Sequence, residues 1–350
     1  MAYVYYIPVL LIPAVILVFR KNERRNDIAL YVSAVSIFLI LALRSFSLGI
    51  DIHIYEYIFE ISKTVSLKDL MNGYTGMEIG YIFLNWLVSR TAGSFRVFLI
   101  VQSLVCVSSY VFLCKKYSVS PVVTLFIICC VGMIDFPIDI IRQSLATAIL
   151  IFSLPQVEKK NPWLFVAFVI LASLFHKIAV LFLVVFPLTL IKPSRKWIIV
   201  FSAASLTLFF LTPFLFNTVG AKIMSLFGKG YTTGEPEMRE MIFIILGIIV
   251  FLLVVTDFSK EIPRKYSFSI WPFLMSLPLL IISIYLHIIS RAAMFIFFPF
   301  VGTVIPNYLR FNRFEKYEKW IIYAICVCFF AYFIFRLKDT YVVPYIFLNS

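Results

Sequence analysis

Charged residues are scarce in this chain: Asp, Glu, Lys and Arg make up 14% of its 350 residues, whereas 62% are hydrophobic. A soluble domain carries about 25% charged and about 45–50% apolar residues. The mean hydropathy is +0.99, so most of the surface cannot face water. The apolar runs also lack the alternation of polar and apolar residues that membrane barrels require. The scarcity of charge therefore excludes a soluble domain and predicts an all-α, polytopic integral membrane helical bundle.

Acidic residues are rarer still, with 18 Asp and Glu against 31 Lys and Arg and a formal net charge of +13. In a soluble protein this charge would indicate nucleic acid, but membrane proteins concentrate Lys and Arg in their cytoplasmic loops. If residues 77–90 dip in and return while every other apolar segment crosses, the inside loops hold 18 of the 31 basic and 7 of the 18 acidic residues. These loops are 20–27, 115–116, 158–160, 192–196, 257–266 and 310–319. We therefore expect about 12 transmembrane helices, one re-entrant segment and no nucleic-acid partner.

Linkers, internal repeats and low-complexity tracts are also missing, so residues 1–350 are expected to form a single transmembrane domain. Its two longest outer loops are 44–76 and 217–240. The inside loops are short, and most polar residues that interrupt apolar runs fall on the outer side. Because ionisable residues within membrane segments are costly and usually functional, the functional groups are expected to face outward.

Motifs for nucleotides and metals do not occur: there is no GxxxxGK[ST] loop, HExxH, DxD or CxxC, and the six cysteines lie in or beside apolar runs. ATP-driven transport and metal-assisted catalysis therefore lack support, and we expect neither a metal nor a cofactor. Several arginines interrupt the apolar runs instead. Guanidinium groups stabilise negative charge where other sites use Mg²⁺.

The stretch "DFPIDIIRQSLATAIL", residues 135–150, carries the most informative of these arginines. Asp139 and Arg142 fall one turn apart, and Arg142 lies about 9 Å beyond the expected helix start. A cation at that depth costs about 2.5–3.5 kcal/mol on insertion scales. A local Asp139–Arg142 ion pair that stabilises the bundle is one explanation. The other is an anion site, for a group such as diphosphate, formed by Arg142 and the positive end of the helix.

Two further stretches place polar residues at the ends of apolar runs. In "SLFHKIAVLF", residues 173–182, His176 and Lys177 sit at an expected outer hairpin tip. They are candidates for a general base or a phosphate contact, the alternatives being a solvated histidine and a snorkelling lysine. In "HIISRAAMF", His287 and Arg291 share a helix face, either as an interfacial polar pair or as a second cationic group for an anionic ligand.

The loop after the second apolar run, "RSFSLGIDIHIYEY", is unusually polar for a connector. Arg44 lies at the outer end of a span, and Gly49 predicts a tight turn that would hold the Asp51 carboxylate in place. Glu78 and Tyr81 open the expected re-entrant segment, where a polar residue is either a helix cap or a ligand contact.

The order of these motifs resembles the EpsG branch of Wzy-type polysaccharide polymerases. The resemblance rests on Arg44, Gly49, Asp51 and Tyr55, on "IRQSLATAI" at 141–149, and on "FHKIAVL" at 175–181. Ile50 departs from the threonine expected before Asp51, and Lys177 from the small or hydroxyl residue expected after His176. The similarity in layout covers most of the chain.

The resemblance implies a GT-C-like glycosyltransferase of the bacterial inner membrane whose site faces the periplasm. Such an enzyme joins undecaprenyl-diphosphate-linked oligosaccharide repeats into O-antigen, capsule or exopolysaccharide, with inversion if displacement is direct. Its donor and acceptor are both lipid-linked glycans, and membrane lipid and a chain-length regulator protein are expected partners. The expected catalytic residues are His176, Asp51 and Arg142, and the expected substrate-binding residues are Arg44, Tyr55, Glu78, Tyr81, Asp139, Gln143, Lys177, His287 and Arg291.

Two other functions fit the composition. An O-antigen ligase is related but normally carries one large outer loop late in the chain, whereas residues 217–240 form a short one. A flippase for lipid-linked oligosaccharides needs polar residues through both leaflets and usually a repeat architecture. A membrane subunit without catalytic function is the remaining alternative, and the intramembrane Arg142 argues against it.

Overall fold

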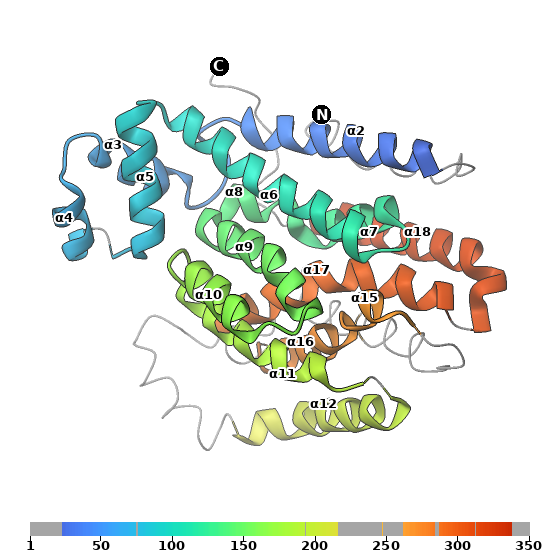
Figure 1. Cartoon of the computed structure of the whole chain (residues 1–350). Helices are drawn as coiled ribbons and strands as arrows, with labels where there is room; N and C mark the ends of the chain where they lie inside the picture. Colours follow the sequence, from blue (N-terminus) through green and yellow to red (C-terminus); the bar gives the residue numbers. More distant parts are fainter. Residues whose placement is uncertain are drawn as a thin grey trace. The chain divides into compact units, whose positions relative to one another are not determined.

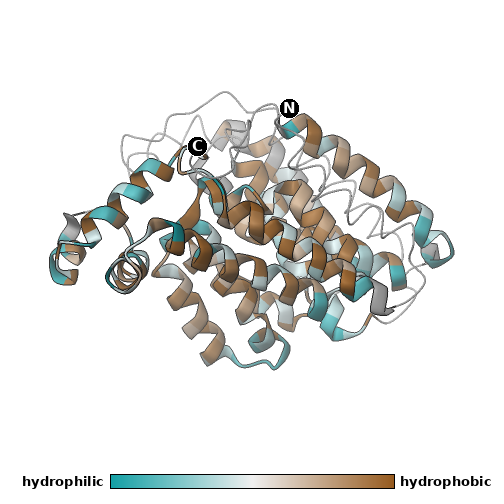
Figure 2. Ribbon diagram, turned by 90° about the horizontal axis from the view of Figure 1, so that it is seen from above, coloured by the Kyte–Doolittle hydropathy of each residue, from teal (hydrophilic) through white to brown (hydrophobic). Residues whose placement is uncertain are grey.

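The structure is a computed structural model, and it describes residues 23–74, 76–192, 194–215, 247, 262–283, 287–311 and 313–337. Every secondary-structure element of more than one residue in these ranges is a helix (Figure 1), which confirms the all-α prediction. Four helical segments there are long and apolar enough to cross a membrane: Phe95–Tyr117, Arg264–Ser283, Arg291–Phe311 and Glu315–Arg336. Apolar residues predominate along the helices, and hydrophilic ones gather near helix ends and connections (Figure 2). The chain is a membrane protein, and the larger count of about 12 spans stays a prediction.

The chain divides into two compact units, Met1–Val180 with Ile321–Ser350, and Leu181–Trp320. We refer to them as the first and second unit. The predicted outer loop 217–240 lies outside the described residues, and the single-domain organisation stays a prediction.

The first unit contains a series of helices and two π-helical turns. They are α2 (Glu23–Ala42), α3 (Ile52–Ser62), α4 (Leu67–Asp69), η2 (Leu70–Tyr74), α5 (Ile79–Thr91), α6 (Phe95–Tyr117), α7 (Pro121–Ile128), η3 (Cys129–Met133), α8 (Phe136–Asp139), α9 (Ile141–Glu158) and α10 (Pro162–Ser173), followed after the second unit by most of α18 (Glu318–Leu337). Helix α6 packs against α2 and α9, and α9 packs against α10.

The second unit is built around two apolar helices that pack against each other, α16 and α17. Its described elements are η4 (Lys177–Val184), which begins in the first unit, α11 (Val185–Leu190), α12 (Arg195–Leu215), α15 (Arg264–Ser267), α16 (Ile270–Ser283), α17 (His287–Phe311) and η6 (Arg313–Tyr317). The Trp271 indole N–H donates to Ile191 O at 2.8 Å, which fixes the end of α11 to α16.

Ion pairs gather three predicted inside loops at one end of the first unit. Lys115, at the end of α6, lies 3.3 Å from the Asp27 carboxylate near the start of α2. Its neighbour Lys116 lies 3.2 Å from the carboxylate of Glu158, the last residue of α9. Loops that charge counting assigned to the same side of the membrane are therefore neighbours in the structure.

Helix α5 stands at the opposite end of the first unit and runs across α2 and α6 rather than along them (Figure 1). At its start, the Gly80 N–H donates to Leu174 O, just past α10, at 2.8 Å. A Cβ on Gly80 would approach that oxygen to 2.8 Å, so only glycine permits this contact. At its end, Thr91 lies close in sequence to the start of α6. Residues 77–90 thus do not traverse the first unit, and their entry into the membrane stays a prediction.

A break between η3 and α9 sets the depth of the polar groups. Gly132, inside η3, has a φ of +129°, and residues 134–140, here called the apex, contain the short helix α8 and lead into α9. Helices α7 and η3 have eight and five residues, about 20 Å in all, whereas the 23 residues of α6 span about 35 Å. Gln102, about 10 Å inside α6, donates to Pro137 O of the apex at 3.2 Å. The apex is therefore recessed within the first unit.

Candidate functional site

Arg142 in the first turn of α9 pairs with Glu78, the residue before α5. The guanidinium Nη1 donates to Glu78 Oε2, and the two side chains are 21% and 16% exposed. The Tyr55 hydroxyl of α3 accepts a further hydrogen bond from the guanidinium. A local Asp139–Arg142 pair was one expected arrangement, but in the described part of the chain the ion pair of Arg142 is to Glu78. Residues from α3, α5 and α9 thus meet at one cation.

The second oxygen of the same carboxylate reaches the connection between α10 and η4, here called the tip. The Lys177 backbone N–H donates to Glu78 Oε1 at 3.3 Å, and the Lys177 side chain is exposed. The contact follows from the close approach of Gly80 to Leu174, which places the start of α5 against this tip. The structure therefore brings Glu78, Arg142 and Lys177 together, and Lys177 contributes its backbone N–H.

His176 is buried rather than solvated at the tip. The residue is 5% exposed, and its Nδ1 accepts a hydrogen bond from the Ile178 N–H at 3.4 Å. The alternative of a freely solvated histidine is therefore wrong. Its assignment as a general base stays a prediction.

The two candidate tyrosines belong to an aromatic core. Tyr55 and Tyr81 are buried and lie edge to face, with ring centroids 5.6 Å apart. Tyr81 also packs edge to face against Phe98 at 5.9 Å. In this arrangement their faces are covered by protein, so they support Arg142 from behind rather than offering a stacking surface for sugars. Tyr57 of the same helix as Tyr55 is 62% exposed.

Arg44 is fully buried, and its guanidinium donates hydrogen bonds to backbone carbonyls. Its guanidinium donates to Leu41 O at the end of α2, to Pro137 O of the apex at 2.8 Å, and to Gln102 Oε1 at 3.4 Å. It therefore ties α2 and α6 to the apex. Sequence reasoning did not single out Gln102, because an amide inside an apolar helix has no pattern of its own.

The predicted turn at Gly49 is confirmed, with φ of +111°. It presents the Ile50 N–H to Asp139 Oδ1 at 3.4 Å, which places the polar loop directly on the apex. Asp51 follows at the start of α3, is half-buried, and does not cap that helix with its side chain. The turn thus holds the residue before Asp51 against the apex, while the catalytic role of Asp51 stays a prediction.

Replacing Gly49 with Ala should destabilise the protein more than replacing Gly76 with Ala. Both glycines have positive φ, which costs other residues about 1–3 kcal/mol. At Gly49 the new Cβ would also come within 2.8 Å of Ile138 O and 3.2 Å of Asp139 Oδ1, whereas Gly76 has open space. The added crowding costs about 1–3 kcal/mol. Thermal unfolding of the purified variants in detergent measures the difference, and equal losses would contradict the close contact.

Arg336 of α18 is a second buried arginine at the apex that sequence reasoning missed. It pairs with Asp135, and both side chains are 7% exposed. The signal was an arginine at the end of the apolar run "FFAYFIFR", residues 329–336. Basic residues commonly flank transmembrane helices, so this one did not stand out. The apex is therefore held by charge-assisted contacts from two buried arginines, Arg44 to Pro137 O and Arg336 to Asp135.

The remaining candidates are placed as follows. Gln143 is buried beside Arg142 at the start of α9. His287 and Arg291 lie on α17 of the second unit at helical i, i+4 spacing, and their role as a second cationic group stays a prediction. Within the ranges that the structure describes, no group of three or more His, Cys, Asp or Glu side chains is placed to hold a metal ion.

These observations describe an integral membrane protein whose basic and acidic side chains meet at a recessed break between helices. Residues 27–347 match the EpsG family, and because the match covers most of the chain, the protein belongs to this family. Membership indicates a polysaccharide polymerase-type function, glycosyltransferase-like at the level of the family. No curated protein and no solved structure matches the chain.

Proposed function

We propose that the protein polymerises undecaprenyl-diphosphate-linked oligosaccharide repeats into O-antigen, capsule or exopolysaccharide at the outer face of the bacterial inner membrane. The carrying observation is Arg142, a half-buried cation at the start of α9 whose guanidinium is oriented by Glu78 and Tyr55. A guanidinium and a helix N-terminus suit a diphosphate. Membership of the EpsG family supports the polymerase class.

The proposed reaction is a direct displacement between two lipid-linked glycans. The donor diphosphate lies near Arg142 and the start of α9. A terminal sugar hydroxyl of the acceptor attacks the anomeric carbon of the donor, and its proton passes to Asp51 or His176. The bond from the anomeric carbon to the diphosphate oxygen breaks, and the electron pair leaves with undecaprenyl diphosphate. The anomeric configuration is inverted.

Asp51 is the better placed of the two proton acceptors. It is half-buried at the loop that contacts the apex and its carboxylate does not cap α3. His176 is buried, and its Nδ1 accepts the Ile178 N–H. We therefore place Asp51 at the acceptor hydroxyl and His176 in a supporting position.

Deletion of the gene and complementation with the wild-type chain tests the function. If the protein is a polymerase, the deletion strain should contain single repeats, and complementation should restore a full polysaccharide ladder. Polymer that accumulates on the lipid carrier would indicate a ligase instead. Loss of repeats from the outer face, with lipid-linked repeats retained inside, would indicate a flippase.

A further inference from the structure

The Glu78 carboxylate occupies an anion site made by other parts of the first unit. One oxygen accepts from the Arg142 guanidinium of α9, and the other accepts from the Lys177 N–H at the start of η4. A guanidinium and a backbone N–H at a helix start are the donors that proteins use to hold phosphate oxygens. The carboxylate therefore stands where a phosphate group of an anionic ligand would find its donors.

The site has donor capacity that Glu78 does not use. The Nε of Arg142 is buried and has no hydrogen-bond partner among the described residues. Buried donors without partners are uncommon in proteins and call for an explanation. A phosphate has more acceptor oxygens than a carboxylate, so a lipid diphosphate satisfies donors that Glu78 leaves unmet.

The geometry also permits Glu78 to leave. It lies just outside α5 in extended backbone, and its side chain makes no cap to that helix. Two residues earlier, Gly76 has φ of +62° and open space around it. Gly80 holds α5 to Leu174 independently through its own N–H. The Glu78 side chain can therefore swing away while α5 keeps its place.

We propose that Glu78 is a built-in competitor that sets the specificity of the site, which rests on the proposed function at Arg142. In the ligand-free state its carboxylate neutralises the half-buried cation. A phospholipid phosphodiester carries a single negative charge, as Glu78 does, and gains little by displacing it. A lipid diphosphate carries at least two charges and more acceptor oxygens, so it displaces the carboxylate. Glu78 thus excludes the bulk phospholipid of the membrane and admits the diphosphate-linked substrate.

Binding to Glu78→Gln tests this competition. The wild type and the variant are reconstituted in phosphatidylcholine nanodiscs and titrated with undecaprenyl diphosphate, with and without phosphatidylglycerol. Because an internal competitor lowers apparent affinity by the fraction of open sites, the variant should bind the diphosphate about tenfold tighter. Phosphatidylglycerol should compete in the variant and not in the wild type. Equal or weaker diphosphate binding by Glu78→Gln overturns the proposal, because it would show that Glu78 only orients Arg142.

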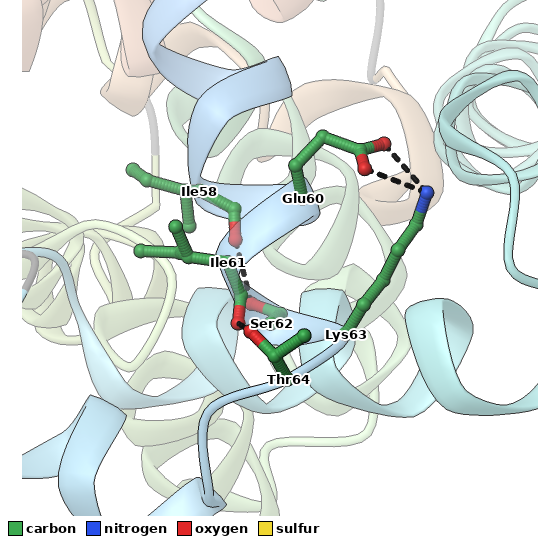
Figure 3. Close-up of polar contacts among 6 residues, drawn as sticks. All are labelled: Ile58, Glu60, Ile61, Ser62, Lys63 and Thr64. Carbon is green, nitrogen blue, oxygen red and sulfur yellow. Dashed lines mark hydrogen bonds and ion pairs between the residues drawn. The ribbon is translucent and has the colours of Figure 1, made fainter.

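Glu60→Gln is the matched control. It removes the same charge from the neighbouring helix α3, where the Glu60 carboxylate is exposed and paired with Lys63 Nζ at 2.7 Å (Figure 3). Its binding should equal that of the wild type. A tightening as large as that of Glu78→Gln would assign the effect to net charge and overturn the competitor role.

A measurement on the wild type covers the case in which the Glu78 variant does not fold. Undecaprenyl diphosphate should speed amide hydrogen exchange at residues 76–79 as Glu78 leaves, and unchanged or slower exchange overturns the proposal. Binding to Arg142→Ala separates the proposed diphosphate site at Arg142 from the competitor role of Glu78. Diphosphate binding that survives Arg142→Ala refutes the proposed site itself, whereas loss of binding there with no effect of Glu78→Gln refutes only the competitor.

Discussion

Replacing Arg142 with Ala is expected to reduce the polysaccharide of the cell from a ladder of lengths to single repeat units, with membrane levels of the protein unchanged. The guanidinium is the cation proposed to bind the donor diphosphate and to stabilise it as it leaves. Loss of one electrostatic contact to a developing charge typically costs about 10²–10³ in rate. Lysine should restore only part of this, because it lacks the planar fork of arginine. Gel analysis of the polysaccharide and immunoblotting of membranes measure both quantities.

Two variants separate catalysis from structure. Arg90→Ala removes an exposed arginine of α5 whose guanidinium donates to Val65 O at 3.3 Å, and it should keep a full ladder. Arg142→Ala combined with Glu78→Ala removes the carboxylate that the single change leaves unpaired. If the ladder is lost because the cation is needed, the double variant stays inactive. A ladder restored in the double variant, or present in Arg142→Ala, refutes the catalytic assignment.

The sequence predicted which helix ends lie together because the excess of Lys and Arg in inside loops is counted over all loops at once. Counting Lys and Arg placed loops 20–27, 115–116 and 158–160 on one side. The structure joins these loops through Lys115 with Asp27 and Lys116 with Glu158. No single loop had to be assigned with certainty for the pattern to emerge.

The partner of Arg142 could not be predicted in this way. Helical spacing relates residues only within one continuous helix, so the ion-pair partner that it offered for Arg142 was Asp139. The structure ends α8 at Asp139 and starts α9 at Ile141, with Ile140 at φ of −126° between them. That break removes Asp139 from the face of Arg142, and Glu78 arrives from a distant segment. The tyrosines were likewise assigned to a ligand because burial in an aromatic core depends on packing that local sequence does not encode.

Arg336→Ala is expected to cause the largest loss of stability. Its partner Asp135 would stay buried without a counter-charge, and breaking a buried pair on one side costs about 3–5 kcal/mol. Part of the hydrogen-bonding capacity of the pair is already unmet, since Arg336 Nε and Nη2 have no partner among the described residues. The pair therefore acts chiefly through charge. Thermal unfolding in detergent should show a clear fall in melting temperature.

Replacing both partners tests whether charge is the cause. Arg336→Met combined with Asp135→Leu keeps the volume and removes both charges, and such exchanges are often neutral or stabilising. The double variant should recover most of the lost stability. Lys63→Ala, which breaks an exposed pair with Glu60, should cost no more than about 0.5 kcal/mol. If the double variant is as unstable as Arg336→Ala, the arginine contributes through packing of its stem, and α18 is held to the apex by shape rather than by charge.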